Sequence, residues 1–221
     1  MKILPVLALI FITAIAARAD VVVEQKIESA MANGNMTIKV KGDMARVDMP
    51  SAAGQATVIM NFKTGESTTL MHDQKMAVKM DIKATKQRAE AQQKAAGIDT
   101  SKLDKPKATG ATETVGEWKA DVYQFNVGTM SGKIWSAKDF PDAQALKDEL
   151  KKINEASSSG FDPSKMEVPG MPVKSQLVTP AGEITMTLIK AKREPVADSE
   201  FVIPAGYSEM KMPAVPGAAP Q

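Results

Sequence analysis

The feature that most constrains the fold of this chain is a set of short segments with an apolar residue at every second position. Residues 76–82 read MAVKMDI, and the same alternation occurs at 36–40 (MTIKV), 58–62 (VIMNF) and 184–188 (ITMTL). A period of two places the apolar side chains on one face of a β-strand and the polar side chains on the other. The sequence therefore predicts an antiparallel sheet with one buried and one solvated face.

Turn signals separate these segments at short, regular intervals. Between residues 21 and 82 they predict six strands, joined at Asn33-Gly34, Gly42-Asp43, Gly54, Thr64-Gly65 and Asp73-Gln74. Asn-Gly is a strong hairpin signal because both residues tolerate a positive φ. Further strands are predicted at 111–115, 117–127, 132–137, 171–179 and 183–194, with 201–210 closing the fold. The pattern indicates a mainly β protein, in which consecutive strands pair with each other.

Two segments have helical character. Residues 83–96 (KATKQRAEAQQKAA) are rich in helix formers and precede Gly97, but their only apolar side chains are alanines. Residues 141–156 carry Ala143, Leu146, Leu150 and Ile153 at spacings of three and four, which form one apolar stripe. The second helix is therefore expected to pack on the sheet, and the first to bury little.

The N-terminus has the features of a secretory signal peptide. Lys2 precedes an apolar run from Ile3 to Ala16, and Ala17-Arg18-Ala19 follows with small residues at the cleavage positions. Cleavage after Ala19 would export the protein to the periplasm or the extracellular medium. No other segment is apolar enough to span a bilayer. Residues 20–210 are expected to form one β-rich domain, and the Pro/Ala-rich residues 211–221 a disordered tail.

Composition excludes several functions. Removal of residues 1–19 takes Lys2 and Arg18 from 28 basic residues, which leaves basic and acidic residues equal in number. A neutral chain lacks the basic surface that a nucleic-acid-binding protein needs. The absence of Cys excludes thiolate zinc sites, and a single His nearly excludes the usual His-based ones. No cofactor is expected.

No residue is expected to be catalytic. His72, the only imidazole, lies at a predicted turn beside Asp73, and no G-x-S-x-G motif supplies a nucleophile. It is interpreted as a surface residue. Thioether sulfur suits Cu(I), and Met71, His72 and Met76, or Met210 and Met212, are the best local sets. The strand methionines, however, alternate in phase with Val, Ile and Phe, so we interpret them as apolar packing residues and expect no metal site.

Four segments carry a resemblance to a known family. They are 116–123 (GEWKADVY), 134–137 (IWSA), 170–173 (GMPV) and 201–207 (FVIPAGY). Together with the Met-rich strands they resemble a family of exported bacterial proteins catalogued as a domain of unknown function, which is similar in turn to the periplasmic lipoprotein carriers of the LolA/LolB kind. The resemblance implies a curved antiparallel sheet, a half-open β-barrel around a helix, with a cavity for acyl chains. It implies no catalytic residues.

One apolar face is expected to form the binding site. Two narrow helices cannot cover several strands spaced about 4.8 Å apart, so an apolar ligand could complete the cover. The hypothesis assigns the ligand to Met36, Ile38, Val58, Met60, Phe62, Met76, Val78, Met80 and Ile82, with Val40 on the same face. The favoured function is non-catalytic binding of a lipid or acyl chain in the cell envelope. The alternative is a structural or protein-interaction module with a filled core and no small ligand.

Overall fold

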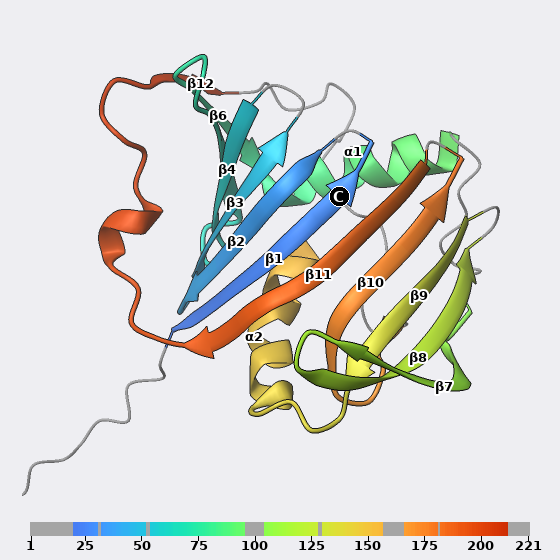
Figure 1. The fold of residues 1–221 in the computed structure, drawn as a ribbon. Helices are drawn as coiled ribbons and strands as arrows, with labels where there is room; N and C mark the ends of the chain where they lie inside the picture. Colours follow the sequence, from blue (N-terminus) through green and yellow to red (C-terminus); the bar gives the residue numbers. More distant parts are fainter. Residues whose placement is uncertain are drawn as a thin grey trace, which may run out of the picture.

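The structure, a computed structural model, describes residues 20–30, 32–51, 54–95, 104–127, 130–156, 166–180 and 182–211. The predicted leader (residues 1–19) and residues 212–221 of the predicted tail lie outside these residues, whereas Lys211, predicted as the first residue of the tail, ends the last strand. The described part forms one curved sheet in the order β12-β6-β5-β4-β3-β2-β1-β11-β10-β9-β8-β7 (Figure 1). Because its two edge strands, β12 and β7, do not pair with each other, the sheet remains open.

The N-terminal half of the sheet is a meander of six strands. These are β1 (Val21–Ser29), β2 (Asn33–Lys41), β3 (Met44–Ser51), β4 (Gly54–Asn61), β5 (Glu66–Met71) and β6 (Met76–Asp81). Each strand pairs antiparallel with the next. The predicted turns at Gly42-Asp43, Thr64-Gly65 and Asp73-Gln74 lie between strands, whereas Asn33-Gly34 and Gly54, predicted as turns, are the first residues of β2 and β4.

The C-terminal half joins the meander through one long-range pairing. It contains β7 (Lys107–Val115), β8 (Trp118–Val127), β9 (Met130–Ala137), β10 (Met171–Thr179) and β11 (Gly182–Arg193). β11 pairs with β1, with Val21 opposite Arg193, and this pairing makes one sheet of two halves. β7 starts at residue 107 rather than the predicted 111, with an irregular register around Gly110, whose φ is +80°.

The closing segment differs from the predicted strand at 201–210. Residues 198–201 form a short 3-10 helix, η3 (Asp198–Phe201), and only β12 (Ser208–Lys211) is extended and paired. β12 lies parallel to β6, with Ser208 opposite Met76. Because β12 and β6 run in the same direction, β12 must start at the end of the sheet where β6 starts. The segment between β11 and β12 therefore first crosses the convex face. There Phe201, Ile203 and Tyr207 pack against the buried residues Ile59, Leu70 and Ala77.

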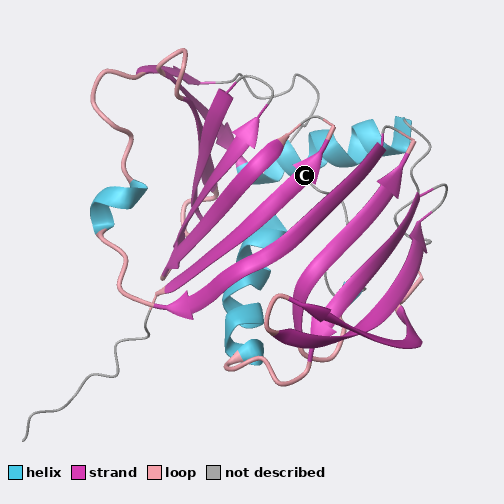
Figure 2. Cartoon of the chain, in the orientation of Figure 1, coloured by secondary structure: helices cyan, strands magenta, loops and turns pink. Residues whose placement is uncertain are grey.

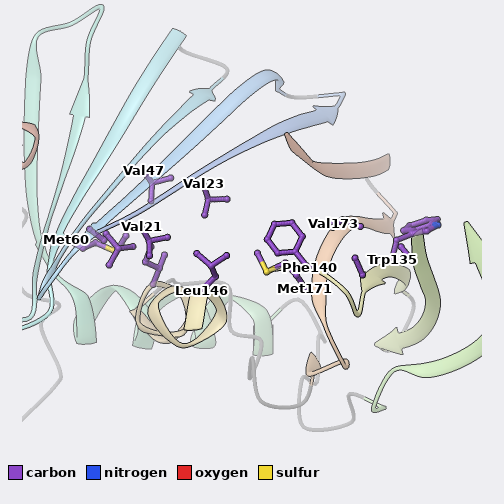
Figure 3. Packing of buried hydrophobic residues seen from close by; sticks show 14 of the residues in the cluster. Val21, Val23, Val47, Met60, Trp135, Phe140, Leu146, Met171 and Val173 are labelled. Carbon is purple, nitrogen blue, oxygen red and sulfur yellow. The ribbon is translucent and has the colours of Figure 1, made fainter. Parts of the chain in front are cut away.

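Both long helices lie on the concave side of the sheet, away from η3 (Figure 2). They are α1 (Ile82–Ala95) and α2 (Ala143–Ala156), close to the predicted segments. In α2, Leu146 and Ile153 are 2% and 8% exposed. Figure 3 shows Leu146 pointing from α2 towards the sheet, on the side where Val21 and Val23 lie. The predicted fold class, a curved antiparallel sheet with two helices, is confirmed.

Candidate ligand-binding cavity

The concave side of the sheet holds a cavity of about 740 Å³. Its walls come from both halves of the sheet, from the first turn of α1, from one flank of α2 and from residues 166–168. Seven methionines line it: Met36, Met49, Met60, Met80, Met166, Met171 and Met186. The cavity is partly open to solvent, since Met186 in its wall is 36% exposed.

Strand register explains why these side chains meet. Antiparallel pairing sets residues directly opposite each other, and such residues project to the same face. One row across the sheet is Val23, Ile38, Val47, Val58, Thr69 and Val78. The next row on the same face is Val21, Val40, Ala45, Met60, Ser67 and Met80. The alternation in each sequence segment thus becomes a continuous apolar surface.

The nine predicted ligand-binding residues divide into two groups. Six line the cavity: Met36, Ile38, Val58, Met60, Met80 and Ile82. Phe62, Met76 and Val78 do not. Phe62 packs against the main buried cluster instead, and Val78 is buried near the edge of the sheet. Because the sheet twists further with each strand, Met76 at the start of β6 lies away from the cavity wall.

Several residues of the cavity wall were not predicted from the sequence, because they come from distant parts of the chain. Phe125 and Ile134 on β8 and β9, and Leu177 on β10, reach the cavity only through the pairing of β11 with β1. The alternation at Ile184 and Met186 was visible in the sequence, but the partner of that strand was not. Ile82 was expected in a strand and is instead the first residue of α1.

Helix α2 divides the concave face into a filled and an open part. Its apolar stripe covers a tightly packed cluster that includes Val21, Val40, Val173 and Phe140. Its flank towards the cavity is mixed: it carries the polar residues Gln144, Lys147, Asp148, Lys151 and Asn154 and the apolar residues Leu150, Ile153 and Ala156. The cavity is therefore mainly apolar on the sheet side and mixed along one helix.

The polar residues of this flank are already engaged within the protein. Gln144 Nε2 donates to Asp148 Oδ1 at 2.8 Å, and Lys147 Nζ donates to the carbonyl oxygen of Val168 at 3.4 Å. Lys151 Nζ lies 3.9 Å from a carboxylate oxygen of Glu155. Positive and negative charges alternate along the flank, so it presents no strong net charge to a ligand.

A second polar cluster lies on the convex face and corrects the interpretation of His72. This residue is half-buried, not a surface side chain. Its Nε2 lies 2.8 Å from Thr57 Oγ1 and its Nδ1 lies 2.5 Å from the hydroxyl of Tyr207. The Thr57 hydroxyl in turn donates to Asp48 Oδ1 at 2.5 Å. Because the Thr57 hydroxyl donates its proton to Asp48, its oxygen can accept a hydrogen bond from Nε2–H of His72.

Asp48 is held in its ionised form. Burial alone would raise the pKa of this carboxyl, but hydrogen bonds from Arg46 and Thr57 outweigh burial and hold the pKa below its usual value. Arg46 Nη1 also donates to the carbonyl oxygen of Glu200, which ties the convex-face segment to β3. Thr57 is fully buried, so its hydroxyl cannot reach a substrate. The cluster therefore fastens the C-terminal segment and does not present a nucleophile.

Of the candidate copper ligands, only Met71 and Met76 are brought together. Met71 and Met76 are opposite each other in the β5–β6 pairing, whereas both nitrogens of His72 are engaged on the convex face. Met210 is 52% exposed, and Met212 lies outside the described residues. Within the described ranges, no group of three or more His, Cys, Asp or Glu side chains is placed to hold a metal ion.

Comparison with known proteins concerns the family and the fold. The model of a protein family described as "Domain of unknown function (DUF4412)" matches residues 22–207. No curated protein matches the chain. Among solved structures, an uncharacterized conserved protein from Thermus thermophilus is similar with a TM-score of 0.50 and 7% identity, over 88% of this chain and 91% of the other. That likeness shows the fold alone.

Two further solved structures are less similar. The Mycobacterium tuberculosis lipoprotein LppX has a TM-score of 0.44 and 12% identity, over 81% of this chain and 88% of the other. PNGF-II has a TM-score of 0.39 and 11% identity, over 89% of this chain and 31% of the other, so the chain spans about a third of its length. Among the described helices, none has the length and apolar character needed to cross a membrane.

Proposed function

Because this chain belongs to the DUF4412 family, a family of unknown function, we propose a function from its own cavity: non-catalytic binding of a lipid or other molecule with an acyl chain, in the cell envelope. Membership confirms the family that the sequence resembles. The observation that carries the proposal is the cavity of about 740 Å³ with an apolar sheet wall. This volume is within the range of about 300–1,000 Å³ typical of small-molecule sites.

The energetic argument concerns the side chains that the protein itself leaves half covered. Met36, Ile38 and Val58 line the cavity without being fully buried. Complete burial of such a side chain is worth roughly 1.5–3 kcal/mol, so a ligand that excludes water from this wall would gain binding energy. Methionine suits a wall of this kind because its flexible thioether adapts to ligands of varied shape.

The competing function is a structural or interaction module without a ligand. It is supported by the filled part of the concave face, where Val21, Val23 and Leu146 are at most 2% exposed. This part shows that the chain can cover its own sheet when it has suitable side chains. The cavity differs because α1 contributes only Ile82 and Thr85 to the wall.

The proposed location of the protein is inferred from its leader sequence. Residues 1–19 have the features of a signal peptide, and they lie outside the described residues. We therefore assign the domain of residues 20–210 to the periplasm or the extracellular medium. These compartments are aqueous, so an apolar ligand would need a carrier to cross them. The absence of Cys suits an exported protein held by its core alone.

Titration of the mature chain with an environment-sensitive fatty-acid probe tests the proposal. Saturable binding is expected, and Met80→Glu should weaken it at least tenfold because a carboxylate would enter the apolar wall. Met76→Glu is the matched control, since Met76 is half-buried on the same strand and face but outside the wall. Absence of saturable binding, together with absence of lipid extracted from the purified protein, would favour the structural alternative.

A further inference from the structure

The cavity opens to solvent along α2. Apart from Met186, the wall residues on the sheet are buried or half-buried. The other exposed wall residues lie on α2 and just before Val168: Gln144, Asp148, Lys151, Asn154 and Glu167. Gln144 and Asn154 lie about 15 Å apart along a helix axis. The sheet therefore forms the floor of the cavity, and the flank of α2 together with residues 166–168 forms its mouth.

The charged residues of the mouth lie at different depths. Asp148, Lys151 and Glu167 are exposed, so water screens their charges. Among the described wall residues, Lys147 is the one charged side chain that is half-buried. Its ammonium group lies at the carbonyl oxygen of Val168, a buried residue of the same wall. The flank carries no strong net charge as a whole, but the charge that lies deepest in the mouth is positive.

Lys147 has no anionic partner among the residues that the structure describes. Its hydrogen bond to Val168 is 3.4 Å long, whereas such bonds are usually about 2.7–3.2 Å. On the same helix, Lys151 and Lys152 each lie within 4.0 Å of a glutamate oxygen. An ammonium group has three N–H donors, so Lys147 keeps donors for a ligand. A partly buried cation without a counter-ion is costly to desolvate, and an anion in the cavity would offset that cost.

The position of Lys151 strengthens this argument. Lys147 and Lys151 are four residues apart, so their side chains are neighbours on the helix surface, and both line the cavity. Two like charges at this spacing destabilise a helix. The ion pair between Lys151 and Glu155 is exposed on both sides and therefore offsets little of this repulsion. An anion bound beside both ammonium groups would remove it.

We propose that the ligand is an amphiphile with an anionic head, a carboxylate or a phosphate, which pairs with Lys147 while its acyl chain lies on the apolar floor. The inference rests on the proposed function and names the class of ligand. In this orientation the charged oxygens stay at the mouth, in contact with water and with two ammonium groups. The chain is removed from water against residues such as Met36 and Ile38.

Other head groups fit this mouth less well. An uncharged ligand would cover Lys147 with apolar surface and leave its ammonium group without a counter-ion. A cationic head would meet two like charges, those of Lys147 and Lys151. The mouth therefore discriminates between ligands by charge, whereas the floor accepts any acyl chain of suitable length.

Calorimetric titration of the mature chain with three single-chain compounds, below their micelle concentrations, tests the inference. Dodecanoate, dodecyl phosphate and dodecanol share one chain and carry a carboxylate, a phosphate and an uncharged hydroxyl group. The wild type should bind at least one of the two anions at least tenfold more tightly than dodecanol, because hydrogen bonds between charged groups are the stronger ones. The tighter of the two anions indicates whether the source is a free fatty acid or a lipid with a phosphate head.

The decisive variant is Lys147→Met, which removes the charge and keeps an unbranched side chain. Affinity for the preferred anion should fall at least tenfold, whereas affinity for dodecanol, which also shows that the variant is folded, should change less than about twofold. Lys152→Met is the matched control, because Lys152 is the same residue type on the same helix but lies outside the wall and pairs with Glu149. This control and Lys147→Arg, which keeps the charge, should both retain the preference for the anion.

Two outcomes would overturn the inference: equal binding of dodecanol and both anions by the wild type, or an unchanged preference in Lys147→Met. In either case acyl chains still bind, so only the anionic head is refuted and the proposed function stands. If none of the three compounds binds the wild type, the proposed function itself fails.

Discussion

Two leucines on α2, four residues apart, allow packing and ligand binding to be measured separately. Leu146 is 2% exposed and belongs to the main buried cluster. Leu150 is half-buried and lines the cavity. The same substitution, Leu→Ala, removes three carbon atoms at either position, so any difference in its effect reports the surroundings and not the chemistry of the change.

The expected magnitudes follow from burial. At about 0.8 kcal/mol per buried methylene, Leu146→Ala loses about 2.4 kcal/mol of transfer energy, and the cavity left behind brings the cost to about 3–5 kcal/mol. Leu150→Ala should cost about 1 kcal/mol, because its side chain is only partly removed from water in the ligand-free protein. A loss of about 3 kcal/mol or more is a large part of a domain's stability of about 5–15 kcal/mol.

Urea denaturation of the ligand-free variants measures the free energy of unfolding, and the fatty-acid probe measures binding. Leu150→Ala should weaken probe binding several-fold, whereas Leu146→Ala should leave it nearly unchanged if measured where the variant is folded. Equal destabilisation by the two substitutions would refute the division of the concave face into a filled and an open part. A cost below about 1 kcal/mol for Leu146→Ala would show that α2 does not cover the core.

Further predictions concern the convex face and the leader. Because the pKa of Asp48 is lowered in the folded state, its contribution to stability is present above its unfolded pKa and is lost as pH falls through the folded pKa. Asp48→Asn should therefore reduce the loss of unfolding free energy that the wild type shows as pH falls. An unchanged dependence of the unfolding free energy on acidic pH would contradict this. Tyr207→Phe removes the hydrogen bond to His72 and should cost about 0.5–1.5 kcal/mol in urea denaturation, with Tyr123→Phe as a comparison at a buried tyrosine elsewhere in the sheet. Intact mass of the protein recovered from cell envelopes should correspond to a chain that begins at Asp20, and a mass that includes residues 1–19 would show an uncleaved leader.

Local patterns in the sequence determined the elements. The alternation in each segment, together with Asn33-Gly34 and the other turn signals, predicted the six-stranded meander from β1 to β6. The stripe formed by Ala143, Leu146, Leu150 and Ile153 predicted which face of α2 is buried. These features are accessible from sequence because side-chain direction in a strand or helix repeats over a few residues. They also predicted the apolar face from which six of the nine proposed ligand residues line the cavity.

Tertiary structure alone decided how the two halves of the chain combine. The pairing of β1 with β11 joins segments far apart in the chain, such as Val21 and Arg193, and no local pattern encodes the partner of a strand. This pairing brings Phe125, Ile134 and Leu177 to the wall shared with Met36 and Ile38.

The convex face follows the same rule. His72 lies in a turn, as the sequence predicts, but its partner Tyr207 arrives from a segment 135 residues later that crosses the sheet before β12 pairs with β6. Strand formation depends on residues near in sequence, whereas burial of a turn residue depends on which distant segment packs over it. The elements and their apolar faces could therefore be predicted from the sequence, whereas the cavity and the half-buried position of His72 depend on the curvature of the sheet and on the joining of its two halves.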